Sequence, residues 1–548
     1  MTTSVSQPPT AARDLPLRYA PFFLCVVIFL LALFAWVAFH AGLFVLLLSA
    51  ALVVLGIYDL LQKKHAVLRN YPVIGHVRYL LESIRPEIRQ YFLEDENERT
   101  PFSRAQRSLV YQRAKNETDK QFFGTQLDVS VTGYEWMNHS MQPSKIASHD
   151  FRVTIGSSAC TQPYSASVFN ISAMSFGALS ANAILALNAG ACAGGFAHDT
   201  GEGSISQYHR EHGGDLIWEI GSGYFGCRNA DGSFNAEAFQ ASAQLPQVKM
   251  IEIKLSQGAK PGQGGVLPAA KISPEIAAAR SIPQGVDCIS PATHSAFSTP
   301  IELLQFIAQL RQLSGGKPVG FKFCLGHPWE WFAIVKAMLQ TGIVPDFIVV
   351  DGKEGGTGAA SSEFSDHVGV PLQEGLQLVH HTLVGAGLRG QIKLGAAGKV
   401  ISAFDIVRMM ALGADWCNSA RGFMFALGCI QSLSCHTDRC PTGVATQDAS
   451  RQQALDPMSK AERVHQYHEN TLKALQALIQ AAGLQHPNDV TPAHIVRRVN
   501  QQEIHLLSTT LMQVKSGDLL NEDLSAMPGI FVRYWPMAQA DSFQCAMH

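Results

Sequence analysis

The sequence predicts an α/β protein, a (β/α)8 TIM barrel preceded by a two-helix transmembrane hairpin. Two observations lead to this prediction. Near the N-terminus, residues 20–58 contain no charged side chain. From residue 169 onward, short apolar runs of β-forming residues alternate with helix-like segments, as expected for a parallel sheet whose strands are joined by helices.

The uncharged stretch is too long for one membrane-spanning helix. A single helix of this length would reach roughly 58 Å, whereas the hydrocarbon core of a bilayer is ~30 Å thick. Two spans fit better, over residues 21–39 and 43–57, with a turn at residues 40–42. A secretory signal is the alternative, but two apolar stretches and no A-x-A site argue against it.

Basic residues flank this hairpin. Arg13 and Arg18 precede it, and Lys63, Lys64 and Arg69 follow it. Because such residues gather on the cytoplasmic side of membranes, both ends are expected to face the cytoplasm. The predicted location is the cytoplasmic (inner) membrane, with a multi-pass hairpin anchor and a catalytic domain on the cytoplasmic side.

Five regions are predicted along the chain: an N-terminal tail (1–20), the hairpin (21–58), a helical connecting collar (59–150), the barrel (151–450) and a C-terminal helical extension (451–548). The connecting region mixes apolar residues with paired charges, which fits a collar packed on the main domain or a segment at the membrane surface. In the extension, residues 461–484 have the pattern of an amphipathic helix. We interpret its His465 and His468 as a solvated face rather than a metal site.

The barrel prediction depends on the number of strands. The candidate strands cover residues 168–174, 194–200, 248–256, 286–290, 318–324, 346–352, 391–398 and 415–420. Eight strand–helix units match a (β/α)8 barrel. A doubly wound sheet is the alternative.

In a barrel, functional residues belong in the loops that follow the strands. Glycine-rich loops occur there: "DTGEGSISQ" contains Glu202, "SQGAKPGQGG" contains Lys260, and "DGKEGGTGAA" follows a later strand. Glycine lets the backbone approach a flat or phosphorylated ligand closely. Each loop taken alone is equally compatible with an ordinary tight turn.

The loops after the last two strands predict an anion site. "GAAGK", residues 395–399, precedes a helix expected to begin near Ser402, so free backbone amides would face an anion. Arg421 follows the last strand. Lys322, in "GFKFC", either points into the barrel mouth, where a cation would stabilise a reduced flavin, or pairs with a buried carboxylate.

Three cysteines, Cys429, Cys435 and Cys440, stand at C-x5-C-x4-C spacing. Zinc sites usually present four ligands, often as two C-x2-C pairs, and this pattern has neither. Three thiolates at longer spacing suit an iron–sulfur cluster better, either [3Fe-4S] or [4Fe-4S] with an open iron. From spacing alone, zinc and unligated cysteines remain alternatives.

Composition narrows the range of partners. The net charge of −2 gives no reason to expect nucleic acid. The eleven cysteines are scattered apart from these three. In a reducing cytosol, clustered cysteines bind metal more often than they pair.

Six separated motifs together resemble the FMN-binding synthase domain of glutamate synthase, most closely its stand-alone relatives. In order, they are "SAMSFGALSANA", "DTGEGSIS", "KLSQGAKPGQGG", "DGKEGGTGA", "HHTLV" and "FALGCIQSLSCHTDRCPTGVATQD", within roughly residues 150–450. The resemblance implies a (β/α)8 barrel with FMN and a [3Fe-4S] cluster. Electrons from an external donor would reach FMN through the cluster. Hydride transfer would then reduce 2-iminoglutarate, formed from 2-oxoglutarate and ammonia, to L-glutamate.

The resemblance also implies roles for individual residues. The cluster ligands would be Cys429, Cys435 and Cys440. Glu202 and Lys260 fall at active-site positions, where Lys260 would engage a substrate carboxylate or polarise the imine. The implied FMN contacts are Met174 and Ser175 beside the isoalloxazine, Gln257 and Lys322 at its polar atoms, and Gly398, Ala420 and Arg421 around the phosphate.

The sequence also departs from the family pattern. It starts "MTTSVSQPP" instead of with a catalytic cysteine, and the glycine-repeat domain is missing, so glutamine hydrolysis is not expected within this chain. Gln263 and Val266 stand in "KPGQGGV" where the family usually has "KPGEGGQ", which leaves the substrate open. "AAGK" replaces the family's Asp-Gly-Gly phosphate loop.

The function expected from the sequence is a membrane-anchored FMN/iron–sulfur oxidoreductase of glutamate synthase type. An amine-oxidising or electron-transfer flavoprotein coupled to a membrane redox partner is the alternative, and a non-enzymatic scaffold is the weakest interpretation. The expected partners are a small 2-oxo or amino acid, an unidentified electron donor and membrane lipid, with a homo-oligomer left open.

Overall fold

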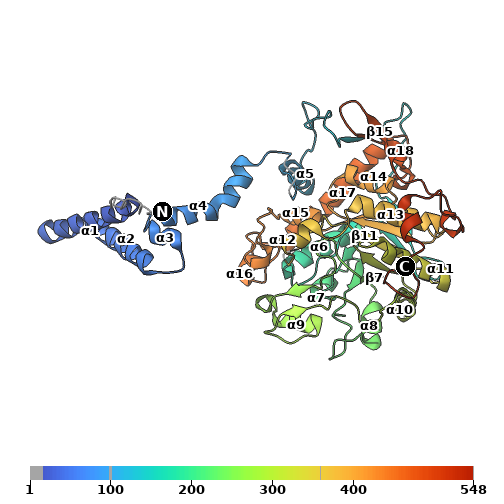
Figure 1. The fold of residues 1–548 in the computed structure, drawn as a ribbon, viewed down its shortest axis with the longest axis horizontal. Coiled ribbons are helices and arrows are strands. Elements are labelled where there is room, and N and C mark those ends of the chain that lie inside the picture. The colour runs from blue at the N-terminus through green and yellow to red at the C-terminus, as the bar shows by residue number, and fades with distance from the viewer. Residues whose placement is uncertain (1–16, 98–100, 358, 547–548) are drawn as a thin grey trace, which may run out of the picture. The chain divides into compact units, whose positions relative to one another are not determined.

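The computed structural model describes residues 17–97, 101–357 and 359–546, which form two compact units divided between Glu98 and Arg99 (Figure 1). Each unit is described by itself. The division falls inside the region between the apolar hairpin and the barrel.

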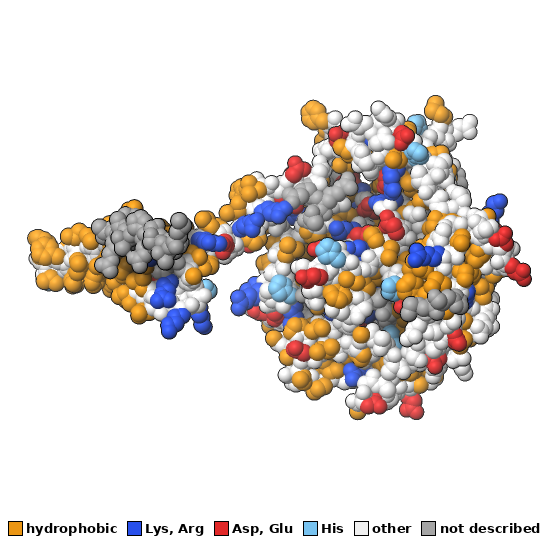
Figure 2. All heavy atoms as spheres, viewed as in Figure 1, with side chains coloured by type: hydrophobic (Ala, Val, Ile, Leu, Met, Phe, Trp, Pro, Cys, Tyr) orange, Lys and Arg blue, Asp and Glu red, His pale blue; other side chains and the backbone are white. Residues whose placement is uncertain are grey.

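The N-terminal unit contains the two predicted apolar helices, α1 (Ala20–Phe39) and α2 (Leu43–Leu61). The turn between them uses left-handed backbone at His40 (φ 50°) and Gly42 (φ 82°). Both helices are long and apolar enough to cross a bilayer, and only 6% and 17% of their most apolar windows are buried. Apolar side chains therefore cover their outer surface (Figure 2), unlike the buried core helix of a soluble protein.

After the hairpin come α3 (Ala66–Asn70), α4 (Gly75–Ile88) and η2 (Arg89–Leu93). Asp59, at the end of α2, is fully buried, accepts a hydrogen bond from the Val73 amide at 2.9 Å and pairs with His76 Nε2 at 2.9 Å. This pairing ties the base of the hairpin to the segment that comes after it. On α4, an apolar face remains exposed, formed by Val77, Leu80, Leu81 and Ile84.

The second unit contains the predicted closed barrel of parallel strands. Its strands in chain order are β4 (Phe169–Ile171), β5 (His198–Asp199), β6 (Leu216–Ile220), β7 (Val248–Lys254), β10 (Val319–Phe323), β11 (Phe347–Asp351), β12 (Lys393–Ala397) and β13 (Trp416–Ser419). β13 pairs with β4 and closes the barrel.

One predicted barrel strand is wrong, and one real strand was missed. Residues 286–290 were predicted as a barrel strand, but Cys288–Ile289 (β9) pairs antiparallel with Val266–Leu267 (β8) outside the barrel. The place in the barrel belongs to β6, whose inward-facing Glu219 breaks the apolar pattern of a buried strand. Glu219 is paired there with Lys322, from a strand far along the chain.

The barrel interior is layered. A hairpin of β2 (Arg152–Ile155) and β3 (Tyr164–Ser167) closes the end where the strands begin, and its Tyr164 hydroxyl donates to Asp215, just before β6, at 2.9 Å. Above it lies an apolar layer of Ile217, Met250, Phe347, Val349 and Trp416. Successive inward-facing positions on a strand are two residues apart. At the next such positions toward the C-terminal ends of β5, β6, β7 and β10 stand the charged residues Asp199, Glu219, Glu252 and Lys322.

Helices surround the barrel (Figure 1). The longer ones are α5 (Arg104–Ala114), α6 (Ala181–Gly194), α8 (Ala236–Ala243), α10 (Pro300–Leu313), α11 (Pro328–Thr341), α13 (Leu372–Gly385), α14 (Ala403–Ala411) and α17 (Pro457–Ala481). Shorter ones are α7 (Gln207–Arg210), α9 (Pro274–Arg280), α12 (Ser362–His367), α15 (Arg421–Leu427), α16 (Ala449–Gln452), α18 (Leu507–Thr510) and α19 (Gly529–Tyr534). A separate small sheet joins β1 (Glu135–Met137) to β14 (Ile495–Arg498) and β15 (Ile504–Leu506).

The interpretation of His468 as part of a solvated helix face is wrong. On α17 it is 4% exposed, its ring stacks on Phe196 with centroids 3.9 Å apart, and Nε2 lies 3.0 Å from Ser167 Oγ. Burial lowers the pKa of His468 to about 3, so this imidazole is neutral. His465, one turn earlier, is half-buried and lies 3.2 Å from Glu469.

Candidate active site at the C-terminal end of the barrel

The predicted catalytic and cofactor residues lie at or just beyond the C-terminal ends of the barrel strands. Met174 and Ser175 follow β4, Glu202 follows β5, Gln257 and Lys260 follow β7, Lys322 lies on β10, Gly398 follows β12, and Ala420 and Arg421 follow β13. Because the strands are parallel and closed into a barrel, these loops gather around one mouth.

Glu202 is the centre of a buried ionic group at this mouth. Its Oε2 lies 2.7 Å from Lys254 Nζ and accepts a hydrogen bond from Ser290 Oγ at 3.2 Å. A Cβ at Gly221 would lie 2.6 Å from Glu202 Oε2, so a larger residue there would shift the carboxylate. Burial raises the pKa of Glu202, but Lys254 and its other neighbours outweigh burial and hold the pKa below its ordinary value. Glu202 is therefore ionised.

Lys260 lies against the same group and is 1% exposed. Burial lowers its pKa, Glu202 opposes that effect, and Lys254 adds to it. Arg280, on α9, is also buried and donates from Nη2 to Ser175 Oγ at 3.4 Å and to the Phe176 carbonyl at 3.2 Å. Three cations thus surround one carboxylate, which suits the site to an anionic ligand.

Two of these cations, Lys254 and Arg280, were not predicted from the sequence. Lys254 had a usable signal, because it follows Glu252 at strand spacing in "IEIKLS" and stands at the end of the strand. Arg280 had none, since it comes from a short helix inserted after β7 and approaches the mouth only through the tertiary fold.

Lys322 takes the second of its two predicted alternatives. It is 3% exposed, and its Nζ contacts the Glu219 carboxylate and lies 3.3 Å from Glu252 Oε1. A direct contact between Lys322 and a flavin ring stays a prediction.

Part of the predicted helix N-terminus after β12 is already hydrogen-bonded within the chain. Ser402 caps α14, and Asp405 Oδ2 accepts hydrogen bonds from the amides of Ser402 at 2.9 Å and Ile401 at 3.1 Å. The Asp405 amide donates to Ser402 Oγ at 3.1 Å. An aspartate at the third helical position completes a capping box, so these three amides already have partners, and anion binding by the remaining amides of this N-terminus stays a prediction.

Positive charge nevertheless gathers beside this loop. Lys399 Nζ and Arg421 Cζ lie 5.7 Å and 4.7 Å from the centroid of the Phe102 ring. Burial lowers the pKa of Arg421 to about 10, although Asp351 and Glu354 oppose it. Burial also lowers the pKa of Lys399, and Arg421 adds to that effect. Two partly desolvated cations side by side are an attractive setting for a phosphate group.

The three predicted cluster cysteines lie in one irregular segment after α15. Gln431, Leu433 and Asp438 adopt left-handed backbone, with φ of 58°, 56° and 62°. Such conformations are strained for residues other than glycine and concentrate at functional sites. Burial raises the pKa of Cys429, a hydrogen bond from the Gln431 amide lowers it, and Cys435 and Cys440 raise it further.

Neighbouring groups fix this cysteine segment in place. The Tyr111 hydroxyl donates to the Cys429 carbonyl at 2.6 Å, and Lys271 Nζ donates to the Cys435 carbonyl at 2.9 Å. Burial raises the pKa of Cys440, but the Thr442 hydroxyl, 3.4 Å away, and nearby backbone amides bring it below the ordinary value. Three thiols in one wound segment, one of them with a lowered pKa, fit a three-thiolate metal cluster.

A pocket of about 580 Å3 lies at the opposite end of the barrel, lined by Tyr164, Asp215, Lys249 and Lys317 among others. Its charged groups already have partners: Asp215 accepts from Tyr164 and lies 3.5 Å from Lys249 Nζ, and Lys317 Nζ donates to the Ala243 and Leu245 carbonyls. We place the site at the mouth instead, because barrel enzymes carry their chemistry at the C-terminal face.

The closed parallel barrel and the ionic mouth define the chain as a (β/α)8-barrel enzyme. Residues 134–485 match the conserved region in glutamate synthase, and the chain belongs to the glutamate synthase family.

Two relatives illustrate the extent of this similarity. The chain is 38% identical over 500 residues to the glutamate synthase large subunit-like protein YerD of Bacillus subtilis (strain 168), which covers 84% of this chain and 95% of that protein. It is 36% identical over 315 residues to the archaeal glutamate synthase (NADPH) of Methanocaldococcus jannaschii, covering 57% of this chain and 58% of that protein. The chain thus spans little more than half of the archaeal relative.

Solved structures are more distant. A flavocytochrome b2 variant with pyruvate bound is 10% identical, with a TM-score of 0.39 over 77% of this chain and 85% of that chain. A likeness this distant says nothing about the chemistry of this chain.

Proposed function

We propose that this chain binds FMN and a [3Fe-4S] cluster at the barrel mouth and reduces a 2-imino acid to an amino acid. The proposed substrate is 2-iminoglutarate, formed from 2-oxoglutarate and ammonia. The observation that carries the proposal is the buried group of Lys254, Lys260 and Arg280 around Glu202, at the mouth of a glutamate synthase family barrel.

The residues at the mouth suit both cofactors. Lys399 and Arg421 would hold the FMN phosphate, with Gly398 and Ala420 beside it, while Met174, Ser175, Gln257 and Lys322 would face the ring. Cys429, Cys435 and Cys440 would hold the cluster. When bound, FMN supplies a hydride and the cluster supplies single electrons from an external donor.

The chain's own residues would bind and orient the substrate. A 2-iminoglutarate molecule carries two carboxylates and an iminium nitrogen. Lys260 and Arg280 would pair with carboxylate oxygens, and the buried setting strengthens such charge-assisted hydrogen bonds. Glu202, held ionised by Lys254, would accept a hydrogen bond from the iminium N–H and thereby fix the imine carbon in place.

Val266 supports a second candidate, an amine-oxidising or electron-transfer flavoprotein. It lies one residue beyond Gly265, which abuts the Glu202 carboxylate, and its side chain is 41% exposed. An apolar side chain there cannot hydrogen-bond a substrate carboxylate, so the site would also accept a smaller or less polar substrate.

Single-turnover kinetics test the substrate. The detergent-purified protein is reduced anaerobically and mixed with 2-oxoglutarate plus ammonia, with each of the two alone, or with other 2-oxo acids plus ammonia. We expect flavin reoxidation to be fastest with 2-oxoglutarate and ammonia together, with glutamate as the product. Equal rates with and without this pair would refute the glutamate assignment and favour the second candidate.

We further propose that α1 and α2 anchor the chain in the inner membrane and that the catalytic domain is on the cytoplasmic side. The apolar face of α4 would lie at the lipid surface. The exposed apolar side chains of both hairpin helices and of Val77, Leu80, Leu81 and Ile84 support this. The full chain should remain with membranes after washes with high salt and alkaline carbonate. Its release into the supernatant by carbonate would contradict an integral anchor.

A further inference from the structure

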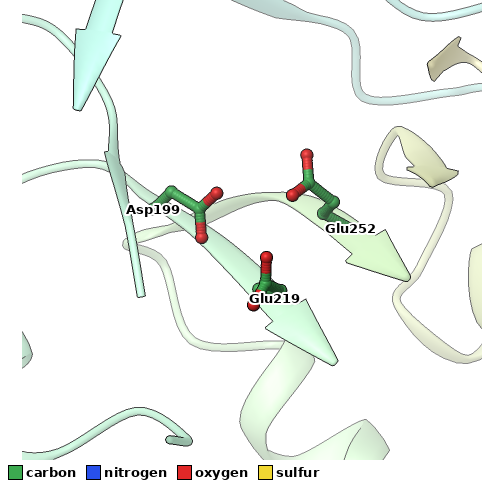
Figure 3. A group of neighbouring side chains, drawn as sticks. All are labelled: Asp199, Glu219 and Glu252. Carbon is green, nitrogen blue, oxygen red and sulfur yellow. The ribbon is translucent and has the colours of Figure 1, made fainter. Parts of the chain in front are cut away.

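Three carboxylates and one ammonium group meet inside the barrel. Asp199, Glu219 and Glu252 stand on the neighbouring strands β5, β6 and β7, and their side chains converge (Figure 3). One oxygen of each lies within 4.8 Å of the others. Lys322 Nζ, from β10, contacts Glu219 and lies 3.3 Å from Glu252 Oε1. The ammonium already supplies a cation here, so a metal ion is not needed to hold the group together.

All four residues are buried, and none is more than 3% exposed. If all were ionised, three negative charges and one positive charge would leave two negative charges without a partner. An unpaired buried charge is strongly unfavourable, and carboxylates this close cannot all ionise. The network therefore holds at least one proton on its carboxyl groups.

The pKa shifts point the same way. Burial raises the pKa of Asp199 to about 7, against the opposing effect of Lys322. Burial raises the pKa of Glu252 well above its ordinary value. Burial lowers the pKa of Lys322, but Glu219 and the other carboxylates outweigh it and raise the pKa. Lys322 thus keeps its charge, and the carboxyl groups carry the exchangeable proton.

Bonding within the network leaves room for this proton. In the described part of the chain, Asp199 Oδ2 and both oxygens of Glu252 have no well-formed hydrogen bond. Glu219 and Glu252 are direct neighbours in the register of β6 and β7. A carboxyl O–H on one of these residues can therefore be shared with the next without displacing an existing donor.

The network lies between the apolar layer and the mouth. Lys254, two residues beyond Glu252 on β7, pairs with Glu202 of the proposed substrate site. Asp351, at the end of β11, accepts a hydrogen bond from the Gly258 amide at 2.8 Å and raises the pKa of Lys322. These two groups face the network from the mouth side.

We propose that Asp199, Glu219, Glu252 and Lys322 form a proton store beneath the cofactor site, which gains a proton when negative charge arrives in the mouth. The proposal rests on the proposed function, because it takes the mouth to hold a flavin. One carboxylate of the network accepts one proton from bulk water and becomes a carboxylic acid. No electrons move within the network, and the proton returns to water when the charge leaves.

Infrared difference spectroscopy of the full chain tests this proton store. The purified protein is reduced by light with a sacrificial donor, and infrared and visible spectra are recorded on the same sample in H2O and in D2O. We expect reduction to add a carboxylic-acid C=O band that shifts in D2O. Glu252→Gln and Asp199→Asn should abolish most of this gain, whereas the exposed Glu237→Gln, on α8, should keep it.

Each other outcome overturns the proton store. Complete flavin bleaching in the wild-type protein without a gain of the carboxylic-acid band refutes it and leaves the proposed function standing. A gain that survives both Glu252→Gln and Asp199→Asn places the proton elsewhere. A visible spectrum without flavin refutes the proton store together with the proposed function. The absence of the band in the wild-type sample refutes the proton store even if a variant fails to fold.

Discussion

Replacing Cys435 by serine is expected to remove the iron–sulfur signal while FMN stays bound. Cys435 opens a short 3-10 turn, Cys435–Thr437, and its carbonyl is held by Lys271 at 2.9 Å. Its side chain is half-buried, so serine fits without a cavity. Removal of a residue that only supports a metal ligand typically lowers metal affinity ~10–100-fold. Loss of one of the three ligands should lower the affinity for the cluster further, so that the purified variant contains little iron.

Iron analysis, visible absorbance and EPR of the anaerobically purified variant measure this effect. Two matched cysteine-to-serine variants serve as controls: Cys192, exposed on α6, and Cys417, buried in β13. Both should keep iron and flavin at wild-type levels. A Cys435→Ser protein with undiminished iron would show that the three cysteines are not the ligand set. Loss of FMN together with iron in a folded protein would show that the two sites are not independent.

Replacing Lys260 by methionine is expected to slow flavin reoxidation by 2-oxoglutarate and ammonia with little change in FMN content. The methionine keeps the length of the buried stem but removes the ammonium. A charge-assisted hydrogen bond contributes about 1.5–3 kcal/mol, which corresponds to roughly 10- to 100-fold in apparent substrate affinity. The loss should therefore appear mainly in the substrate concentration that gives half-maximal rate.

The dependence on pH provides a second readout for Lys260. Because burial lowers its pKa, the charged form is lost as pH rises through a value below the ordinary 10.5. In the wild-type protein, substrate binding should weaken as pH rises through this pKa. Lys260→Met should lack this pH dependence. Lys249→Met, at the other end of the barrel, is the control and should behave as wild type. An unchanged substrate dependence in Lys260→Met would exclude Lys260 from the substrate site.

The barrel was predictable from sequence because most of its strands are apolar runs between helical segments. β6 escaped because Glu219 sits in its interior, and only the folded barrel supplies Lys322 as its partner. The site was predictable where glycine-rich loops marked it, as at Glu202 and Lys260. Arg280 was not predictable, because the sequence of α9 gives no sign that this helix packs over the mouth.

Two short sequence patterns were misleading because a residue outside each pattern changes the environment of the residues within it. "GAAGK" before a helix predicts free amides, but Asp405 already accepts hydrogen bonds from the amides of Ile401 and Ser402. His468 lies in a polar segment by sequence, yet Phe196 and Ser167 enclose it in the structure. In both cases the deciding partner lies outside the pattern that was read.

We expect one barrel mouth to hold a flavin next to a three-thiolate cluster. The most direct measurement is the FMN and iron content of the anaerobically purified full chain, together with its EPR spectrum. We expect about one FMN per chain and an EPR signal of an oxidised [3Fe-4S] cluster that disappears on reduction. A folded protein that carries neither flavin nor iron, and takes up neither on reconstitution, would contradict this claim.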